Sequence, residues 1–426
     1  MNAVTEPDCV FNTIPDGGIC APKGFKACGL RAGIKESAKK RDLALVYSER
    51  PCTSAAVFTR NVVKAANIIV TGEHLEKSGG RIRALVANSG NANACTGARG
   101  LAAARRMAAL AAMRLGIAPE ECAVASTGVI GVPLPLDRVE AAMEALAAGL
   151  REDGADEALE AIMTTDTRKK QRALEFALPP GNPVRIGAMV KGSGMIHPNM
   201  ATMIAVITTD AALSAPALDK ALRRAVNRSF NRLTVDGDTS TNDIALVMAN
   251  GAAGNFPVES ESPAYEIFAA ALESLCVDLA RQMARDGEGA TKLITVTVSG
   301  ADSGEDADAL AKSIAGSSLV KTACFGADAN WGRVLCAMGY SGRDFNPETV
   351  NIRFRSKAGE VEVCRNGAQA VFSEASAKKI LLEEEIEIIV ELGNGAGTAA
   401  NSAAAGTAWG CDLSCDYVKI NGDYRT

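Results

Sequence analysis

The sequence contains 426 residues, of which 47% are hydrophobic and 22% charged, so it can bury a sizeable core in roughly two or three domains. Lys and Arg number 45 against 50 Asp and Glu, and aromatic residues make up 4%, which excludes the basic surplus and the stacking platforms of nucleic-acid binding. No apolar run reaches the roughly 18 residues of a membrane span, and the N-terminus lacks the features of a signal peptide. We therefore expect a cytoplasmic protein without a membrane partner.

Hydrophobic patterns predict the elements in chain order. Alternating or β-branched runs predict strands at Leu43–Tyr47, Ala55–Thr59, Ala84–Asn88, Val184–Val190, Met203–Thr208, Ile244–Met248, Leu293–Val298, Val350–Phe354, Val361–Cys364 and Ile386–Leu392. Ala-rich amphipathic segments predict helices at Gly100–Leu115, Leu136–Glu152, Ala215–Ser229, Tyr265–Arg285 and Asp306–Ala315. Asp137 is a candidate N-cap that would start the second of these helices at about Arg138. Because strands and helices mix throughout, we predict an α/β fold with a mixed layered architecture.

Histidine and cysteine limit the available chemistry. The chain has two histidines, His74 and His197, so a histidine-based triad or a His-rich metal centre would have to use them. The 12 cysteines contain no Cys-x-x-Cys pair, and we expect reduced, buried thiols and no bound metal. We therefore expect the general base of a catalytic reaction here to be a group other than histidine.

One loop between two predicted strands, Lys191-Gly-Ser-Gly-Met-Ile-His-Pro-Asn-Met-Ala-Thr202, contains a candidate nucleophile. If the chain were cut before Thr202, a new α-amino group would lie on the same residue as the hydroxyl. The reference pKa of such an amine is about 7.7–8.0, so a fraction of it is neutral near pH 7 and can act as a base. Taken alone, a threonine at this place more often simply opens a strand; the alternative is a threonine nucleophile activated by its own amine.

Other polar runs carry two interpretations each. In Ala125–Gly131, a Thr-Gly turn could aim the Thr127 hydroxyl and a backbone N–H at an oxyanion, or it could be a plain tight turn. The runs Thr234–Asp243 and Asp286–Lys292 could reach into a cleft or form solvated loops. The run Gly393–Thr398 lacks the last glycine of a dinucleotide-binding turn, so it does not predict a nucleotide site.

Together, the motifs of this chain resemble those of the ornithine acetyltransferases, also called glutamate N-acetyltransferases, of cyclic arginine biosynthesis. The resemblance covers nearly the whole chain, and the motifs come in the family's order. It rests on the runs Ala55–Asn61, Ala87–Ala94, Ser126–Gly131, Met163–Thr167, Lys191–Ile196, Asn199–Met203, Ser240–Asp243, Asp286–Lys292, Gly326–Arg333, Ala408–Leu413 and Asp416–Thr426. The stretch Gly393–Gly406 departs from the family pattern, being longer and richer in alanine.

The resemblance implies that the chain cleaves itself between Ala201 and Thr202. The products would be an α chain of residues 1–201 and a β chain of residues 202–426. It also implies that Thr202 is the nucleophile and that Thr127 and Gly128 form the oxyanion hole. The fold would be the family's own α/β architecture, and the cleaved chains would associate as an α2β2 heterotetramer.

The resemblance further implies the reaction. The acetyl group of N-acetylornithine would pass to glutamate through an acetyl ester on Thr202, with ping-pong kinetics and without a cofactor. Opposite charge suggests that Lys191 pairs with the α-carboxylate common to both substrates and that Glu288 receives an amino group. Acetyl-CoA is a candidate second donor to glutamate. The substrate contacts implied by the motifs are Thr164 (with Thr165 as the neighbouring alternative), Lys191, Thr202, Glu288, Asn421 and Thr426.

Two other functions fit the same residues. In an N-terminal-nucleophile amidohydrolase or aminopeptidase, water rather than an amine would intercept the acyl-threonine. In a non-catalytic amino-acid-binding protein, the polar runs would only line a pocket, and the chain of 426 residues would stay intact.

Overall fold

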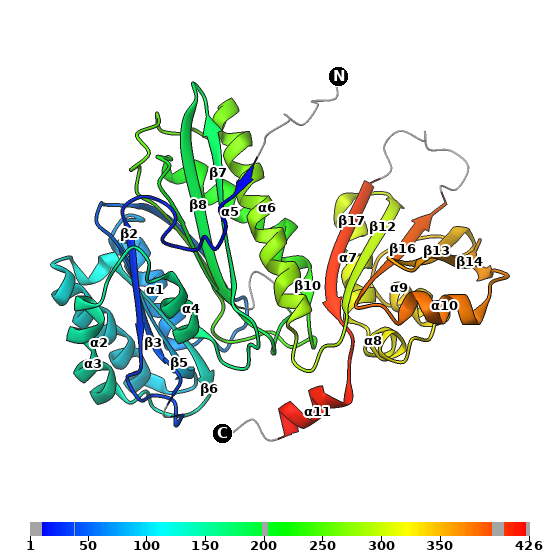
Figure 1. Cartoon of the computed structure of the whole chain (residues 1–426), viewed down its shortest axis with the longest axis horizontal. Coiled ribbons are helices and arrows are strands. Elements are labelled where there is room, and N and C mark those ends of the chain that lie inside the picture. The colour runs from blue at the N-terminus through cyan, green and yellow to red at the C-terminus, as the bar shows by residue number, and fades with distance from the viewer. Residues whose placement is uncertain (1–10, 38, 198–202, 394–403, 423–426) are drawn as a thin grey trace. The chain divides into compact units, whose positions relative to one another are not determined.

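Two units make up the described part of the chain, residues 11–37, 39–197, 203–393 and 404–422 of a computed structural model (Figure 1). Unit 1 comprises Met1–Gly192, Pro198–Asn231 and Thr239–Leu279. Unit 2 comprises Ser193–His197, Arg232–Asp238 and Ala280–Thr426. Both units contain residues from either side of the predicted cleavage point, so the predicted α and β chains do not coincide with the units.

Unit 1 contains two mixed sheets. The first has the strand order β1-β7-β8-β9-β11-β4, and the second has the order β2-β3-β5-β6. The strands of the first sheet are β1 (Asn12–Thr13), β7 (Lys170–Leu178), β8 (Asn182–Lys191), β9 (Ile204–Thr209), β11 (Ile244–Ala249) and β4 (Thr53–Phe58). Those of the second are β2 (Phe25–Leu30), β3 (Leu43–Ser48), β5 (Ala84–Asn91) and β6 (Cys122–Val129). The helices of this unit are α1 (Ala66–Lys77), α2 (Gly97–Leu115), α3 (Leu136–Ala148), α4 (Ala155–Ile162), α5 (Ala215–Arg228) and α6 (Pro263–Arg285), whose last turns belong to unit 2.

The second sheet of unit 1 is buried on both faces, and β3 shows how. Ala44 and Val46 belong to a core that also includes residues of α4, β8, β9 and β11. Leu43 and Leu45 point to the opposite face and pack with residues of α2 and α3, which lie outside this sheet in Figure 1. Successive side chains of a strand face opposite ways, so a strand with two buried faces reads as a continuous apolar run. This layering confirms the predicted mixed α/β architecture.

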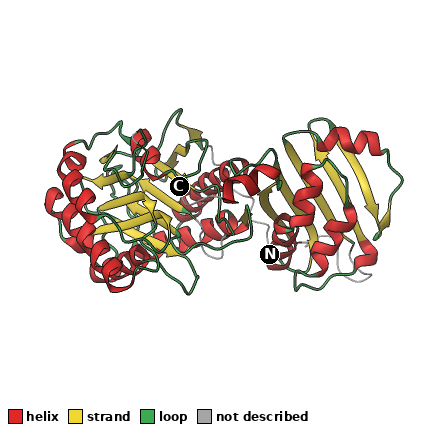
Figure 2. Ribbon diagram, turned by 90° about the horizontal axis from the view of Figure 1, so that it is seen from below, coloured by secondary structure: helices red, strands yellow, loops and turns green. Residues whose placement is uncertain are grey.

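Unit 2 is a seven-stranded sheet with helices packed on one face (Figure 2). Its strand order is β10-β17-β12-β16-β13-β14-β15. The strands are β10 (Leu233–Thr234), β17 (Ala404–Cys411), β12 (Leu293–Ala301), β16 (Glu385–Leu392), β13 (Val350–Ser356), β14 (Gly359–Arg365) and β15 (Ala368–Gln369). The helices are α7 (Gly304–Gly316), α8 (Ser318–Phe325), α9 (Trp331–Gly339), α10 (Glu374–Leu381) and α11 (Cys415–Gly422).

The two faces of this sheet alternate along each strand. On β13, Ile352 and Phe354 are buried under the helices, whereas Arg353 and Arg355 point away and pair with carboxylates of β14 and β16. Such half-exposed ion pairs contribute little stability, about 0–1 kcal/mol each. The apolar face is therefore what holds unit 2 together.

Two local predictions are corrected. α3 begins at Leu136 with Pro135 as its N-cap residue, so Asp137 lies inside the first turn and is not the cap. The helix ends at Ala148 rather than at Glu152, because Arg151 leaves it to form a β-bridge with Ala27 of β2. In the stretch Gly393–Gly406, residues 394–403 lie outside the described residues, and Ala404 begins β17.

Candidate active site

Thr127 and Gly128 lie near the end of β6, which runs parallel to β5. A turn was one expectation here, but the structure shows both residues paired with β5, where the register shifts at Asn91. Gly128 has a φ of +132°, and a Cβ added to it would lie 2.6 Å from the Asn91 nitrogen. Only glycine fits this backbone and this approach, so Gly128 fixes the position of Thr127.

Lys191 is the buried last residue of β8 and reaches Thr127. Its Nζ donates a hydrogen bond of 3.3 Å to Thr127 Oγ1. Because the lysine supplies the proton of this bond, the Thr127 hydroxyl keeps its own proton for a different acceptor. A hydroxyl held in this way beside the Gly128 N–H is able to stabilise an oxyanion.

Asp166 joins the Met163–Thr167 motif to the end of β8. Its carboxylate accepts from the Thr164 nitrogen at 2.9 Å and from the Gly192 nitrogen at 2.8 Å, and it forms a buried ion pair of 2.8 Å with Lys170. Burial alone would raise the pKa of this carboxyl, but the charges of Lys191 and Lys170 hold it well below its usual range. The group therefore stays ionised. Sequence reasoning did not single out Asp166, although it lies inside a motif that carried the resemblance.

The Ser240–Asp243 motif joins the start of β11 to β6 by hydrogen bonds. The buried Asn242 amide donates to the carbonyl oxygen of Ser126 at 2.8 Å and to that of Ala92 at 2.6 Å. Asp243 is also buried, and its Oδ2 has no hydrogen-bond partner among the described residues. Burial raises the pKa of the Asp243 carboxyl well above its usual range, although the Ser240 hydroxyl and the charge of Lys191 oppose the shift. The surroundings of Asp243 thus favour the protonated form of its carboxyl.

The predicted cleavage point, Ala201 and Thr202, lies outside the described residues, as does Thr426. The described chain resumes at Met203, which is buried and whose carbonyl oxygen accepts from the Ile244 nitrogen at 2.8 Å. The next residue, Ile204, pairs with Lys191 in β8 and with Ile244 in β11. Lys191 is therefore opposite a residue only two positions after Thr202 in the sequence.

Glu288 and Asn421 form a second polar group, in unit 2. The Asn421 side chain donates to Glu288 Oε2 at 2.8 Å, and the Glu288 nitrogen donates to the Ser193 carbonyl oxygen at 2.8 Å. A Cβ added to Gly194 would lie 2.5 Å from Glu288 Oε1, so the glycine makes room for the carboxylate. The structure thus brings these two predicted substrate contacts together, just as it brings Thr127, Gly128 and Lys191 together in unit 1.

The histidines are placed outside these contacts. His74 lies on α1, where its Nδ1 is 2.8 Å from the Cys122 carbonyl oxygen. His197 lies in unit 2 with its Nδ1 2.9 Å from Thr234 Oγ1, and burial, helped by the charge of Lys312, lowers its pKa to about 4. In the described ranges, no three His, Cys, Asp or Glu side chains cluster closely enough to hold a metal ion. Within the same ranges, no helix has the length and apolar character needed to cross a bilayer.

Comparisons with known proteins agree with the motifs. The sequence matches the ArgJ family over residues 26–426. It is 54% identical over 411 residues to the "Arginine biosynthesis bifunctional protein ArgJ" of Symbiobacterium thermophilum, covering 96% of this chain and 99% of that protein. It is 51% identical over 413 residues to the protein of the same name from Caldanaerobacter subterraneus, covering 97% of this chain and all of that protein (100%).

A solved structure is also similar to part of this chain. It is the ornithine acetyltransferase of Mycobacterium tuberculosis complexed with ornithine, which is 42% identical. The match has a TM-score of 0.42 and covers 45% of this chain and 100% of that one.

Proposed function

The chain belongs to the ArgJ family, and from this premise we propose that it transfers the acetyl group of N-acetylornithine to glutamate in arginine biosynthesis. Acetyl-CoA serves as a second donor to glutamate, as the word bifunctional in the relatives' names suggests. The observation that carries the proposal is the hydrogen bond from Lys191 to Thr127 beside Gly128, since acyl transfer needs an oxyanion site. No cofactor takes part.

The first step of the proposed mechanism is self-cleavage. The Thr202 hydroxyl attacks the carbonyl carbon of Ala201, the peptide C–N bond breaks, and the Thr202 nitrogen takes up a proton to become an amine. Water then hydrolyses the ester, which leaves a carboxylate on Ala201 and restores the hydroxyl. The products are residues 1–201 and 202–426.

Acetyl transfer follows the same path with a different acyl group. The freed Thr202 amine accepts the hydroxyl proton as the oxygen attacks the acetyl carbon of N-acetylornithine. Thr127 and Gly128 donate hydrogen bonds to the developing oxyanion, and removal of one such donor typically costs 10²–10³ in rate. Ornithine leaves with the proton, and the amine of glutamate then attacks the acetyl ester to give N-acetylglutamate.

The charged residues bind the substrates. Lys191 pairs with the α-carboxylate that both amino acids carry, and Glu288, oriented by Asn421, receives an amino group. Thr164, whose backbone is fixed by Asp166, and Thr426 supply further contacts. The α2β2 assembly and the cytoplasmic location remain predictions from the sequence.

A denaturing gel with N-terminal sequencing tests the proposal directly. The wild-type protein should give two bands, one starting at Thr202, whereas Thr202→Ala should give one intact chain without activity and Thr202→Ser should still be cut. Acetate release without glutamate, compared with N-acetylglutamate formation in its presence, separates transferase from amidohydrolase. An active sample that contains only the intact chain would refute the mechanism.

A further inference from the structure

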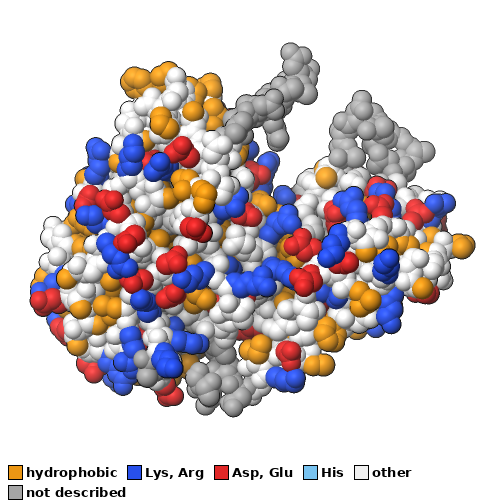
Figure 3. Space-filling model, viewed as in Figure 1, with side chains coloured by type: hydrophobic (Ala, Val, Ile, Leu, Met, Phe, Trp, Pro, Cys, Tyr) orange, Lys and Arg blue, Asp and Glu red, His pale blue; other side chains and the backbone are white. Residues whose placement is uncertain are grey.

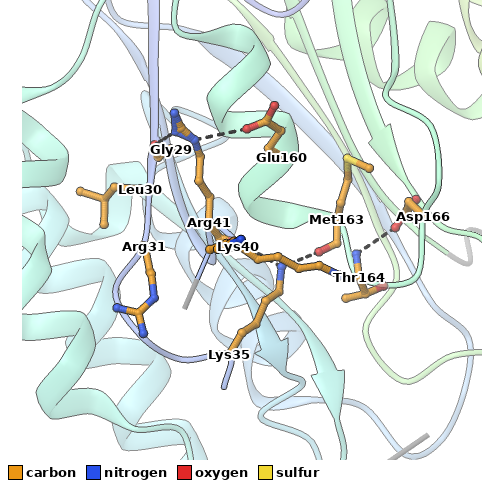
Figure 4. A pocket seen from close by; sticks show the side chains of 11 residues that line it. Gly29, Leu30, Arg31, Lys35, Lys40, Arg41, Glu160, Met163, Thr164 and Asp166 are labelled. Atoms are coloured by element: carbon orange, nitrogen blue, oxygen red, sulfur yellow. Dashed lines mark hydrogen bonds and ion pairs between the residues drawn. The ribbon is translucent and has the colours of Figure 1, made fainter. Parts of the chain in front are cut away.

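A basic cavity lies in unit 1, beside the connection between β2 and β3. Its volume is about 630 Å³, within the range of cavities that bind nucleotide-sized ligands. One wall comes from the end of β2 and the connection that follows it, and the other from the end of α4 and the segment Met163–Asp166 (Figure 4). Five cationic side chains line it: Arg31, Lys35, Lys39, Lys40 and Arg41.

Only one of these five cations has a carboxylate partner in the described part of the chain. Arg41 pairs with Glu157 at 2.9 Å and with Glu160 at 3.3 Å. The other four cationic side chains form no ion pair with any described carboxylate. The Lys35 Nζ instead donates to main-chain carbonyl oxygens, at 2.7 Å to Met163 and at 3.0 Å to Arg41. In Figure 3, Lys and Arg side chains, drawn in blue, gather at the lower left, in the region where Figure 1 shows the connection between β2 and β3.

The cavity therefore carries an excess of positive charge, five cationic side chains against the carboxylates of Glu160 and Asp166. Burial, helped by the nearby charges of Lys40 and Lys191, lowers the pKa of Lys35 to about 8 against the opposing effects of Asp42 and Asp166. A bound anion would favour the charged form of Lys35 and relieve the repulsion among its neighbours. Clusters of Arg and Lys suit phosphate groups, which accept several charge-assisted hydrogen bonds at once.

The position of the cavity indicates which phosphate compound it takes. Thr164 and Asp166 form part of its wall, and Asp166 also holds the Gly192 nitrogen next to Lys191. Asp166 thus links this wall to the end of β8, where Lys191 donates its hydrogen bond to Thr127. In some donors a long flexible arm separates the acyl group from the phosphates. Such a donor can bind its phosphates in this cavity while its acyl carbon lies near Thr127.

We propose that this cavity binds the phosphate groups of acetyl-CoA when that thioester donates its acetyl group to glutamate. The inference rests on the proposed function, because it concerns the second donor of the same site. In the reaction, the bond between the acetyl carbon and the CoA sulfur breaks as the ester to the Thr202 oxygen forms. The hydroxyl proton leaves with the thiol, and glutamate then takes the acetyl group as before.

A double variant in the cavity tests the inference. Lys39→Ala with Lys40→Ala removes two exposed cations, so the fold should be unaffected. The KM for acetyl-CoA and the Kd of CoA, measured by calorimetry on the full protein, should rise roughly ten- to hundredfold. The KM for N-acetylornithine should not change. Lys378→Ala with Lys379→Ala, an exposed lysine pair on α10, is the matched control and should change neither constant.

The contrary outcomes are distinct. An unchanged Kd of CoA in the cavity variant would overturn the inference, as would a wild-type protein that does not bind CoA. Equal increases in both KM values would assign the cavity to the amino-acid substrates instead. If inorganic pyrophosphate occupies the cavity but does not compete with CoA, the site is a phosphate site unrelated to the donor. By contrast, a wild-type protein that transfers no acetyl group from N-acetylornithine to glutamate would refute the proposed function itself.

Discussion

The Lys191 ammonium group donates its hydrogen bond to the Thr127 hydroxyl oxygen over 3.3 Å, between the end of β8 and the end of β6. The lysine occupies a lone pair of that oxygen and leaves its proton available. A hydroxyl with a free proton is what the proposed oxyanion role of Thr127 requires.

Removal of that hydroxyl should slow acetyl transfer strongly. Thr127→Val keeps the shape of the side chain, and we expect kcat/KM to fall about 10²–10³-fold because one oxyanion donor is lost. Thr127→Ser keeps the donor and should stay within about tenfold of the wild type. Initial rates of N-acetylglutamate formation measure both. A Thr127→Val protein with the kcat/KM of the wild type would show that the hydroxyl is not an oxyanion donor.

Gly128→Ala should destabilise unit 1 more than the same change at a nearby glycine. The new Cβ would be strained by the φ of +132° and would also crowd Asn91. Together these effects cost about 2–5 kcal/mol in the free energy of unfolding. Gly131 has a φ of +83° and nothing within 4 Å of a Cβ, so Gly131→Ala should cost only about 1–2 kcal/mol. Urea unfolding curves give both values, and equal costs would disprove the crowding.

Asp166→Asn should destabilise the protein at neutral pH by about 3–5 kcal/mol, because it breaks a buried ion pair with Lys170. The pKa of Asp166 is depressed by Lys191 and Lys170 against the effect of burial. Its contribution is therefore complete above the unfolded pKa of about 3.9 and is lost as the pH falls below it. The stability difference between wild type and variant should shrink below about pH 4 in urea unfolding. Asp156→Asn, which breaks a half-exposed pair with Lys169, is the control and should cost less than about 1 kcal/mol.

Asp243→Asn should have the opposite pH dependence. Burial raises the pKa of this carboxyl, so the folded wild type loses stability as the pH rises above the unfolded value of about 3.9. The loss continues up to the folded pKa, by up to about 1.4 kcal/mol per pH unit. Asparagine does not ionise, so the free energy of unfolding of the variant should rise relative to that of the wild type as the pH increases above about 4. Parallel stability curves would mean that Asp243 is already a carboxylate in the folded protein.

The sequence predicts strands well where burial and local pattern agree. Leu43–Tyr47 and Leu293–Val298 contain alternating or β-branched residues and lie within β3 and β12. β6 escaped prediction because its small residues have little intrinsic preference for a strand, and only the cores on its two faces select that conformation.

The candidate site shows the same limit. The motifs predicted Thr127, Lys191 and Glu288 as candidate site residues, because the hydroxyl, ammonium and carboxylate groups indicate what each could bind. They could not show that Asn242 holds Ser126 from 116 positions away, because such a contact exists only once β11 and β6 are folded. For the same reason, the sequence did not predict the hydrogen bond that the Gly192 nitrogen donates to the Asp166 carboxylate.

The strand order of the first sheet in unit 1 determines how the two fragments would be held together after cleavage before Thr202. β9 and β11 follow that point in the sequence, yet β9 pairs with β8 and β11 pairs with β4, both of which precede it. The two fragments would thus be interleaved by main-chain hydrogen bonds on both sides of the β9–β11 pair. They should copurify in the absence of denaturant, and neither fragment made alone could complete this sheet.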